Sequence, residues 1–323
     1  MLLPELSPEQ RGRAGREIVK FRHRLEETGL FTDAALARLI DETPREMLTV
    51  CTMRENPPAN ETWIAGEAGD LSGAELVAAA RTGKLWFSPR SAMTRHPRYA
   101  RVFQRLMDEF AAETGIRVLS ADAAVLISSP RMGIFFHVDP AETMLMHVRG
   151  HKTLHVYPPT PEAVSEQALE AILLKETLSD LPYDPAMEAE AAHVALAPGE
   201  TLYWPLHSPH RVTNGDDLNV SVSVEFSSPR SRLQNGVFYT NGVLRRRLGI
   251  RPRSRGTPEI LHPAYLAAAK LLKTVVPAGT VERDHARRFD VDLSAPDCIR
   301  WREGLRPDWA KPEPRKRPGR KAA

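Results

Sequence analysis

The sequence predicts a mostly β core in which short strands form a jelly roll, with helices flanking it on its N-terminal and C-terminal sides. Three observations carry this prediction. Residues 116–228 contain a series of short runs rich in β-branched and aromatic residues, separated by turn residues such as Pro198 and Gly199. The chain on either side has helical periodicity. The composition, with 42% hydrophobic and 26% charged residues, is typical of a folded globular protein and not of a disordered chain or a membrane bundle.

Residues 1–115 are predicted to form a helical and mixed region that packs on the barrel. Ser7 can cap a helix, and apolar residues then recur at Ile18, Phe21 and Leu25. The other elements expected here are helices at 33–40, after the capping box of Ser72 with Glu75, and after Pro97, together with β-like pieces at 62–64 and 85–87.

The jelly-roll core is predicted over residues 116–228, with a helical insertion at 161–176. Its expected strands are 116–119, 124–128, 132–139, 143–149, 152–157, 192–197, 201–204, 210–213 and 218–226. Residues 229–310 are predicted to be C-terminal helices, centred on 233–248 and 263–275, which offer a candidate homodimer contact.

The last segment, residues 311–323, holds six basic residues and one acidic residue, in a chain whose net charge is +3. Such a segment buries little apolar surface, so we expect a disordered tail. The tail is also a candidate contact for nucleic acid through phosphate neutralisation, although a solvated terminus is the commoner outcome for a run of this kind.

Two features of the sequence favour a cytoplasmic protein. No apolar run approaches the roughly 20 residues that a membrane-spanning helix needs, and the N-terminal residues lack the pattern of a secretory signal. The chain has two cysteines, Cys51 and Cys298, in unrelated contexts. This usage argues against a disulfide framework and against a thiolate metal site.

A candidate metal site begins in the segment Met132 to Asp139, which reads MGIFFHVD. Residues two apart on a strand share a face, so His137 and Asp139 are expected to point the same way. A third ligand must come from another strand, and His207 and His210 both follow the strand-like TLYWP. Two imidazoles and one carboxylate on one face of a metal are typical of non-haem Fe(II) centres, although zinc accepts the same ligands.

The order of motifs around this segment resembles the JmjC and cupin-like family of Fe(II)- and 2-oxoglutarate-dependent oxygenases, which includes asparaginyl and ribosomal-protein hydroxylases. The resemblance covers roughly residues 125–228. The motifs that carry it are His137-Val138-Asp139, the hairpin Gly150-His151-Lys152 ending in Tyr157-Pro158-Pro159, the turn Pro198-Gly199-Glu200, and Pro205 followed five residues later by His210.

The resemblance implies a double-stranded β-helix and a 2-oxoglutarate-dependent dioxygenase that hydroxylates its substrate. It implies that His137, Asp139 and His210, rather than His207, hold Fe(II), and that Lys152 pairs with the distal carboxylate of 2-oxoglutarate. The remaining histidines lack this spacing and are interpreted as structural or surface residues; they are His147, His151, His155, His193 and His207.

The expected strand at 219–226 alternates between polar and apolar residues. Ser221, Ser223 and Glu225 lie on its polar face, which could meet solvent or could line the pocket and bind the cosubstrate. Family members often have an amide where this chain has Glu225. A carboxylate there would repel the carboxylates of the cosubstrate unless it is paired or protonated.

The fold and the metal do not determine the substrate. The relatives that the resemblance points to suggest a protein side chain, and a small molecule is the rival; demethylation would follow if the hydroxylated carbon were attached to nitrogen. An alternative from another class is a non-oxygenase cupin-type metal-binding regulatory protein, associated with nucleic acid through its basic C-terminal region.

Overall fold

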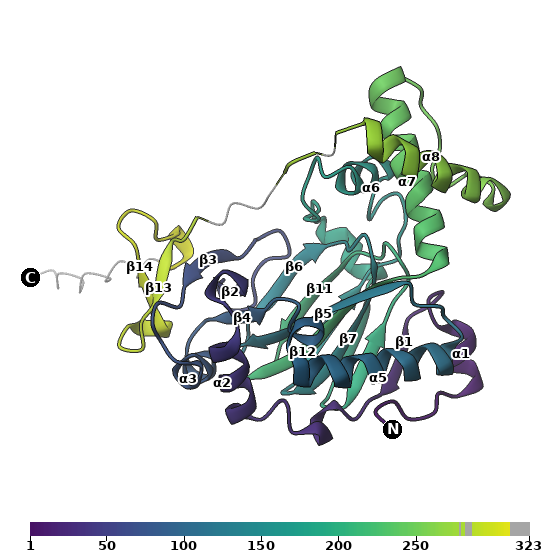
Figure 1. The fold of residues 1–323 in the computed structure, drawn as a ribbon. Helices are drawn as coiled ribbons and strands as arrows, with labels where there is room; N and C mark the ends of the chain where they lie inside the picture. Colours follow the sequence, from purple (N-terminus) through teal and green to yellow (C-terminus); the bar gives the residue numbers. More distant parts are fainter. Residues whose placement is uncertain (278, 282–285, 311–323) are drawn as a thin grey trace, which may run out of the picture.

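The computed structural model describes residues 1–277, 279–281 and 286–310, and their strands form two sheets (Figure 1). The predicted disordered tail, residues 311–323, lies outside the described residues. The larger sheet contains, in spatial order, β1 (Val19–Arg22), β10 (Glu200–Tyr203), β7 (Glu142–Arg149), β12 (Asn219–Ser227), β5 (Ser120–Ser128), β4 (Trp86–Pro89), β2 (Leu48–Thr52), β3 (Ile64–Glu67), β13 (Phe289–Val291) and β14 (Ile299–Trp301). The smaller sheet contains β6 (Gly133–His137), β11 (His210–Asn214), β8 (Lys152–Val156) and β9 (Ala192–Leu196).

The larger sheet buries both of its faces. One face packs against helices in the main hydrophobic core, which includes Val222 and Val224 of β12 together with Leu106 and Phe110 of α5. The helices α2 (Asp33–Glu42), α3 (Gly73–Thr82) and α5 (Pro97–Thr114) cover this face (Figure 1). The short helix α4 (Ala92–Arg95) joins the same core.

The other face of the larger sheet meets the smaller sheet. A second core fills the space between them, with Leu145 and Leu202 from one sheet and Leu154 and Val212 from the other. The predicted jelly roll is therefore confirmed, and its strands follow the expected order from β5 to β12. One expected strand, 116–119, is absent, because the chain there leads from α5 into β5.

The N-terminal segment departs from its predicted helix. Helix α1 spans only Pro8–Arg13, and the chain then turns at Gly15, whose φ of 74° is in the left-handed region. The apolar residues that follow belong to β1, where Val19 and Phe21 are buried and Lys20 is exposed. Strand β1 pairs with β10, so tertiary pairing overrides the apparent helical spacing.

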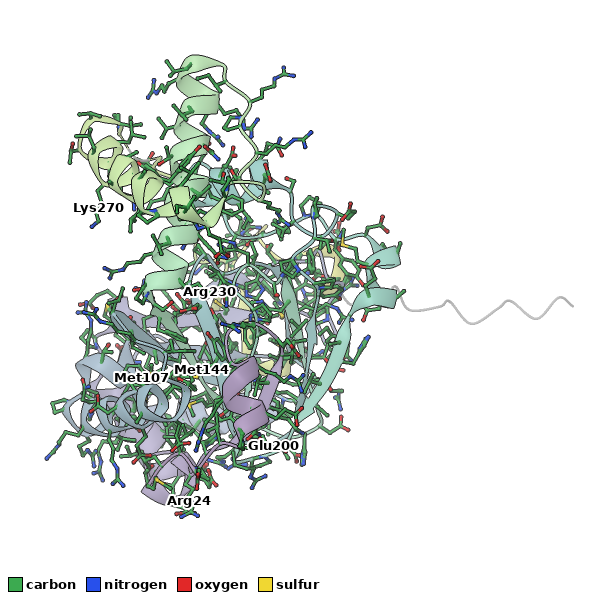
Figure 2. All side chains as sticks on the ribbon, turned by 90° about the vertical axis from the view of Figure 1, so that its right-hand side faces the viewer. Arg24, Met107, Met144, Glu200, Arg230 and Lys270 are labelled. Carbon is green, nitrogen blue, oxygen red and sulfur yellow. The ribbon has the colours of Figure 1, made fainter. Side chains whose placement is uncertain are left out.

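The C-terminal helices are confirmed in part. Helices α7 (Pro229–Leu248) and α8 (His262–Val275) form as predicted and pack on each other. Figure 2 shows this pair projecting from the body, with Lys270 of α8 far from Met144 of β7. The helical prediction is wrong for residues 289–301, where β13 runs parallel to β3 and extends the larger sheet. The division of the chain into domains stays a prediction.

We expect Gly66→Ala to destabilise the docking of β13. A Cβ at Gly66 would overlap the ring of Phe289, which is fully buried, so the ring must shift. Overpacking of this kind costs about 1–3 kcal/mol. Urea unfolding measures the loss. Gly12→Ala is the matched control, because nothing lies within 4 Å of its new methyl group, and an equal loss in both variants would contradict this packing.

Within the described ranges, no helix combines the length and apolar character that a membrane crossing requires.

Candidate metal centre

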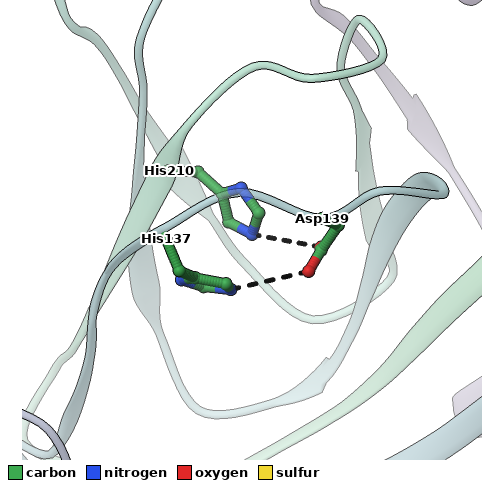
Figure 3. Close-up of side chains that lie close together, drawn as sticks. All are labelled: His137, Asp139 and His210. Carbon is green, nitrogen blue, oxygen red and sulfur yellow. Dashed lines mark ion pairs between the residues drawn. The ribbon is translucent and has the colours of Figure 1, made fainter. Parts of the chain in front are cut away.

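The three side chains predicted as metal ligands converge at one end of the barrel (Figure 3). His137 is the last residue of β6, His210 is the first residue of β11, and these antiparallel strands place the two residues opposite each other. Asp139 follows His137 by two residues. Its Oδ1 lies 3.9 Å from Nε2 of His137, and its Oδ2 lies 3.5 Å from Nε2 of His210.

Backbone carbonyl groups orient both imidazoles. Nδ1 of His137 donates to the carbonyl oxygen of Phe135 at 2.8 Å, and Nδ1 of His210 donates to that of Ser208 at 3.3 Å. With the proton on Nδ1, each ring presents the lone pair of Nε2 toward Asp139, and hydrogen bonds of this kind orient the ligating histidines of metal sites. Burial, followed by the neighbouring His137, lowers the pKa of His210 to about 4. The ring is therefore neutral near pH 7, which is the form that binds metals.

The exposure of the group leaves one side of it open. His210 is buried, whereas His137 and Asp139 are half-buried. A set of three ligands that does not enclose the ion can leave coordination positions for other molecules, as catalytic sites do.

The structure separates His210 from His207, the other candidate for the third ligand. His207 has a φ of 66°, and its Nε2 lies 2.7 Å from Oδ1 of Asn235 on α7. Its ring therefore contacts α7 instead of joining His137 and Asp139. Of the two histidines, the geometry places only His210 in the group.

Lys152, predicted to bind the distal carboxylate of the cosubstrate, points into the barrel. It lies opposite Asn214 in the pairing of β8 with β11, and only 6% of its surface is exposed. Among the described residues its ammonium has no hydrogen-bond or ion-pair partner, and burial lowers its pKa to about 7. An unpaired cation in a protein interior is costly, so this position fits an anionic group that arrives with a ligand.

The polar face of β12 also lies inside the barrel. Ser221 is fully buried, and its Oγ lies 3.0 Å from Nδ1 of His147 on β7. Ser223 is half-buried beside Leu145, and Glu225 is exposed at the mouth. Crowding by protein still desolvates the Glu225 carboxyl and, together with the charges of Asp139 and Asp122, raises its pKa to about 7. Contact of these three residues with a cosubstrate stays a prediction.

The sequence left open whether His147 is a structural or a surface residue, and the structure makes it a buried structural residue. The ring is fully buried, and its Nε2 has no hydrogen-bond partner within the described part of the chain. Burial, followed by the charge of Lys152, lowers its pKa to about 3, so the ring is neutral. The signal was available, because alternation along β7 places His147 on the same face as Leu145.

The unpaired ammonium makes a testable contribution to stability. The folded-state pKa of Lys152, about 7, lies below its ordinary value of 10.5. The unfolded chain therefore binds more protons between these values, and stability rises with pH. The loss of stability caused by the buried, charged ammonium is therefore complete below pH 7 and disappears near pH 10.5. We expect the free energy of unfolding of Lys152→Met to be higher than that of the wild type by a few kcal/mol at pH 6. The difference should be smaller at pH 9.5. Denaturant unfolding at both pH values checks this, and a gap independent of pH would contradict it.

The fold and this group of ligands define the class: a cupin-like barrel with a two-histidine, one-carboxylate metal-binding group. Residues 88–231 match the family model described as a cupin-like domain. That range contains His137, Asp139 and His210, so the predicted family resemblance is confirmed for the part of the chain that holds the site. Over this range, the chain is similar to cupin-like domains.

A solved structure agrees with this fold. The X-ray structure of YcfD from Escherichia coli has a TM-score of 0.50 at 19% sequence identity, and the match covers 84% of this chain and 68% of that one. A structure described as YcfD, a ribosomal oxygenase from Escherichia coli, in complex with cobalt and 2-oxoglutarate, has a TM-score of 0.47 at 17% identity over the same shares. No curated protein matches the sequence.

Proposed function

We propose that this protein is an Fe(II)- and 2-oxoglutarate-dependent oxygenase that hydroxylates a side chain of another protein. The observation that carries the proposal is the pairing of an open His-Asp-His group with an unpaired buried ammonium on the same inner face of the barrel. Neither a structural metal site nor an ordinary hydrophobic core accounts for both features.

The spacing of the two features suits a short dicarboxylate. Lys152 lies opposite Asn214, which is four residues along β11 from His210, so the backbone positions are about 13 Å apart. An imidazole at one end, a lysine side chain at the other and a five-carbon diacid between them fill that length. One carboxylate would then lie at the metal and the other at Lys152.

Each residue has a defined role in this proposal. His137, Asp139 and His210 hold one face of Fe(II), and the bound metal with its cosubstrate supplies the oxidation chemistry. Lys152 fixes the distal carboxylate, and Leu145 and Leu154 keep water from the interior.

A protein side chain is the substrate class that we favour, with hydroxylation as the reaction. The Escherichia coli protein is described as a ribosomal oxygenase, and in this chain His137 and Asp139 are only half-buried, so that a side chain of another protein could approach them from outside. A small molecule is the second substrate class, and demethylation would follow from hydroxylation beside nitrogen.

Incubation of the protein with cell extract, Fe(II) and 2-oxoglutarate should add the mass of one oxygen atom to a protein in the extract. A product only among metabolites would favour the small molecule.

The rival regulatory role makes a different prediction. A nucleic-acid-binding cupin would bind DNA with a steep salt dependence and would consume no 2-oxoglutarate. The open ligand group favours the enzyme, because a purely structural metal site is normally closed by four protein ligands. DNA binding measured against salt, beside a 2-oxoglutarate consumption assay, separates the two roles.

We also propose that α7 and α8 mediate a homodimer in the cytoplasm. The segment that includes α8 exposes Ile260, Leu271 and Val275, at 87%, 67% and 68% of their surfaces. Neither cysteine forms a disulfide bond, as expected in a reducing compartment. Light scattering should give a molecular mass of twice that of the chain. Replacement of Leu271 by Glu should reduce the mass in solution to that of a single chain.

A further inference from the structure

A second group of metal-ligating side chains lies on the outer face of the smaller sheet. Lys152, Leu154 and Val156 of β8 face inward, so His155 faces outward. His193 of β9 lies directly opposite it in the strand register. Glu188, in the short 3-10 helix Pro185–Glu190, reaches the same point from the segment before β9.

The three side chains present converging donor atoms. Oε1 of Glu188 lies 3.3 Å from Nδ1 of His155 and 3.5 Å from Nε2 of His193. One donor atom from each residue lies within 4.8 Å of the other two. His155 is nearly buried, whereas His193 reaches solvent, so an ion could enter from outside.

We propose that His155, Glu188 and His193 bind a zinc ion that is separate from the metal at the oxygenase site. Zinc bonds of about 2.0–2.1 Å in a tetrahedron place neighbouring donors about 3.3 Å apart. The two measured distances, 3.3 and 3.5 Å, match that spacing. Two imidazoles and a carboxylate are ligands that zinc accepts, with the fourth position left to water.

The surroundings of the group hold the ligands in a metal-binding orientation. Without a metal, Nδ1 of His155 donates to Oε1 of Glu188 at 3.3 Å and Nε2 accepts from the hydroxyl of Thr213 at 3.2 Å. A zinc ion would replace the proton on Nδ1, and Nε2 would then donate to Oγ1 of Thr213, which can act as donor or acceptor. The second carboxylate oxygen of Glu188 accepts hydrogen bonds from the hydroxyl groups of Tyr157, at 2.8 Å, and Tyr183. Hydrogen bonds of this kind support ligating residues in metal sites.

Arg211 limits the affinity of the group for a cation. Its Nη2 donates to Oε1 of Glu188 at 2.6 Å, and its Nε donates to the hydroxyl of Tyr157 at 2.9 Å. The guanidinium thus already neutralises the carboxylate and repels a second cation. Two imidazole ligands add no negative or positive charge when they bind a metal, and a carboxylate oxygen can accept from Arg211 while it binds a metal.

A zinc ion here would fix a segment that also flanks the oxygenase site. Upstream of Glu188, the carbonyl oxygen of Ser179 accepts from the backbone amide of Val138, between His137 and Asp139, at 3.1 Å. The amide of Leu181 donates to the carbonyl of Phe136 at 3.3 Å. The segment would thus be attached to β6 at its start and clamped to β8 and β9 by the ion at its end.

The test counts zinc in the untagged, full-length protein after equilibration with micromolar zinc. We expect His193→Asn to bind one zinc per chain fewer than the wild type. His151→Asn is the matched control, because His151 is another exposed histidine on the adjoining hairpin, and it should keep the wild-type count. When cobalt replaces zinc, the wild type should show the absorption spectrum of four-coordinate cobalt, and His193→Asn should lack the part of that spectrum that comes from this site.

The result that would overturn the proposal is an equal metal count in all three proteins. Because the comparison rests on a difference of one ion, it does not depend on whether the oxygenase site takes zinc. Asp139→Asn, which alters only the oxygenase site, should retain the zinc that depends on His193. Loss of that zinc in Asp139→Asn would also contradict the proposal that the two metal sites are separate.

Discussion

Replacement of His210 by alanine should abolish 2-oxoglutarate turnover and weaken Fe(II) binding by more than about a hundredfold. His210 is 4% exposed, its Nε2 lies 3.5 Å from Asp139, and among the described residues the metal-ligating group at this place consists of His137, Asp139 and His210. Loss of a single contact to a ligand already costs about 10- to 100-fold in metal affinity, and loss of the ligand itself should cost more. Equilibrium metal binding and succinate formation measure the two effects.

His207→Ala is the matched control for that substitution. His207 is also a buried histidine after β10, but its ring contacts Asn235 instead of Asp139. This variant should keep its affinity for metal, with circular dichroism confirming that both variants fold. Full turnover in His210→Ala together with loss in His207→Ala would show that the third ligand is misassigned.

Lys152→Met should raise the 2-oxoglutarate concentration required for half-saturation by roughly 30- to 1,000-fold. The removed ion pair is buried, and breaking such a pair costs on the order of 2–4 kcal/mol. Metal affinity should be nearly unchanged, because Lys152 lies four residues along the sheet register from the His210 position. Calorimetric titration of the metal-loaded protein separates cosubstrate binding from catalysis.

The same variant carries an internal check on the assignment. Methionine removes a buried charge, so the protein without ligand should become more stable while its affinity for 2-oxoglutarate falls. Lys20→Met is the control, since Lys20 is a half-exposed strand lysine that pairs with Glu200 at 3.1 Å. An unchanged 2-oxoglutarate titration in Lys152→Met would remove Lys152 from the cosubstrate site.

The convergence of the three candidate metal ligands could be predicted from the sequence because each part of the group has a local signature. Alternation along a strand places His137 and Asp139 on one face, and the resemblance to the JmjC and cupin-like family, through the spacing from Pro205, implies His210 as the third ligand. Lys152 follows from the hairpin motif and from the inward face of β8. The polar face of β12 was ambiguous, because alternation alone does not say whether a polar face meets solvent or the interior of a barrel.

The parts that sequence reasoning missed depend on contacts between distant segments. Strand β1 forms because its backbone pairs with β10 at the edge of the larger sheet. Strand β13 forms because Phe289 packs over Gly66, which lies more than two hundred residues earlier in the chain. The second group of ligands likewise requires the register that sets His155 opposite His193. Neither the edge nor the register is visible in local periodicity.

The most direct test of the account is anaerobic addition of 2-oxoglutarate to the protein loaded with one Fe(II). We predict a visible charge-transfer band that saturates at one 2-oxoglutarate per chain, needs a higher concentration in Lys152→Met and is absent in His210→Ala. This measurement requires neither dioxygen nor knowledge of the substrate. A protein that binds Fe(II) through His137, Asp139 and His210 but develops no band at any 2-oxoglutarate concentration would contradict the assignment as a 2-oxoglutarate-dependent oxygenase.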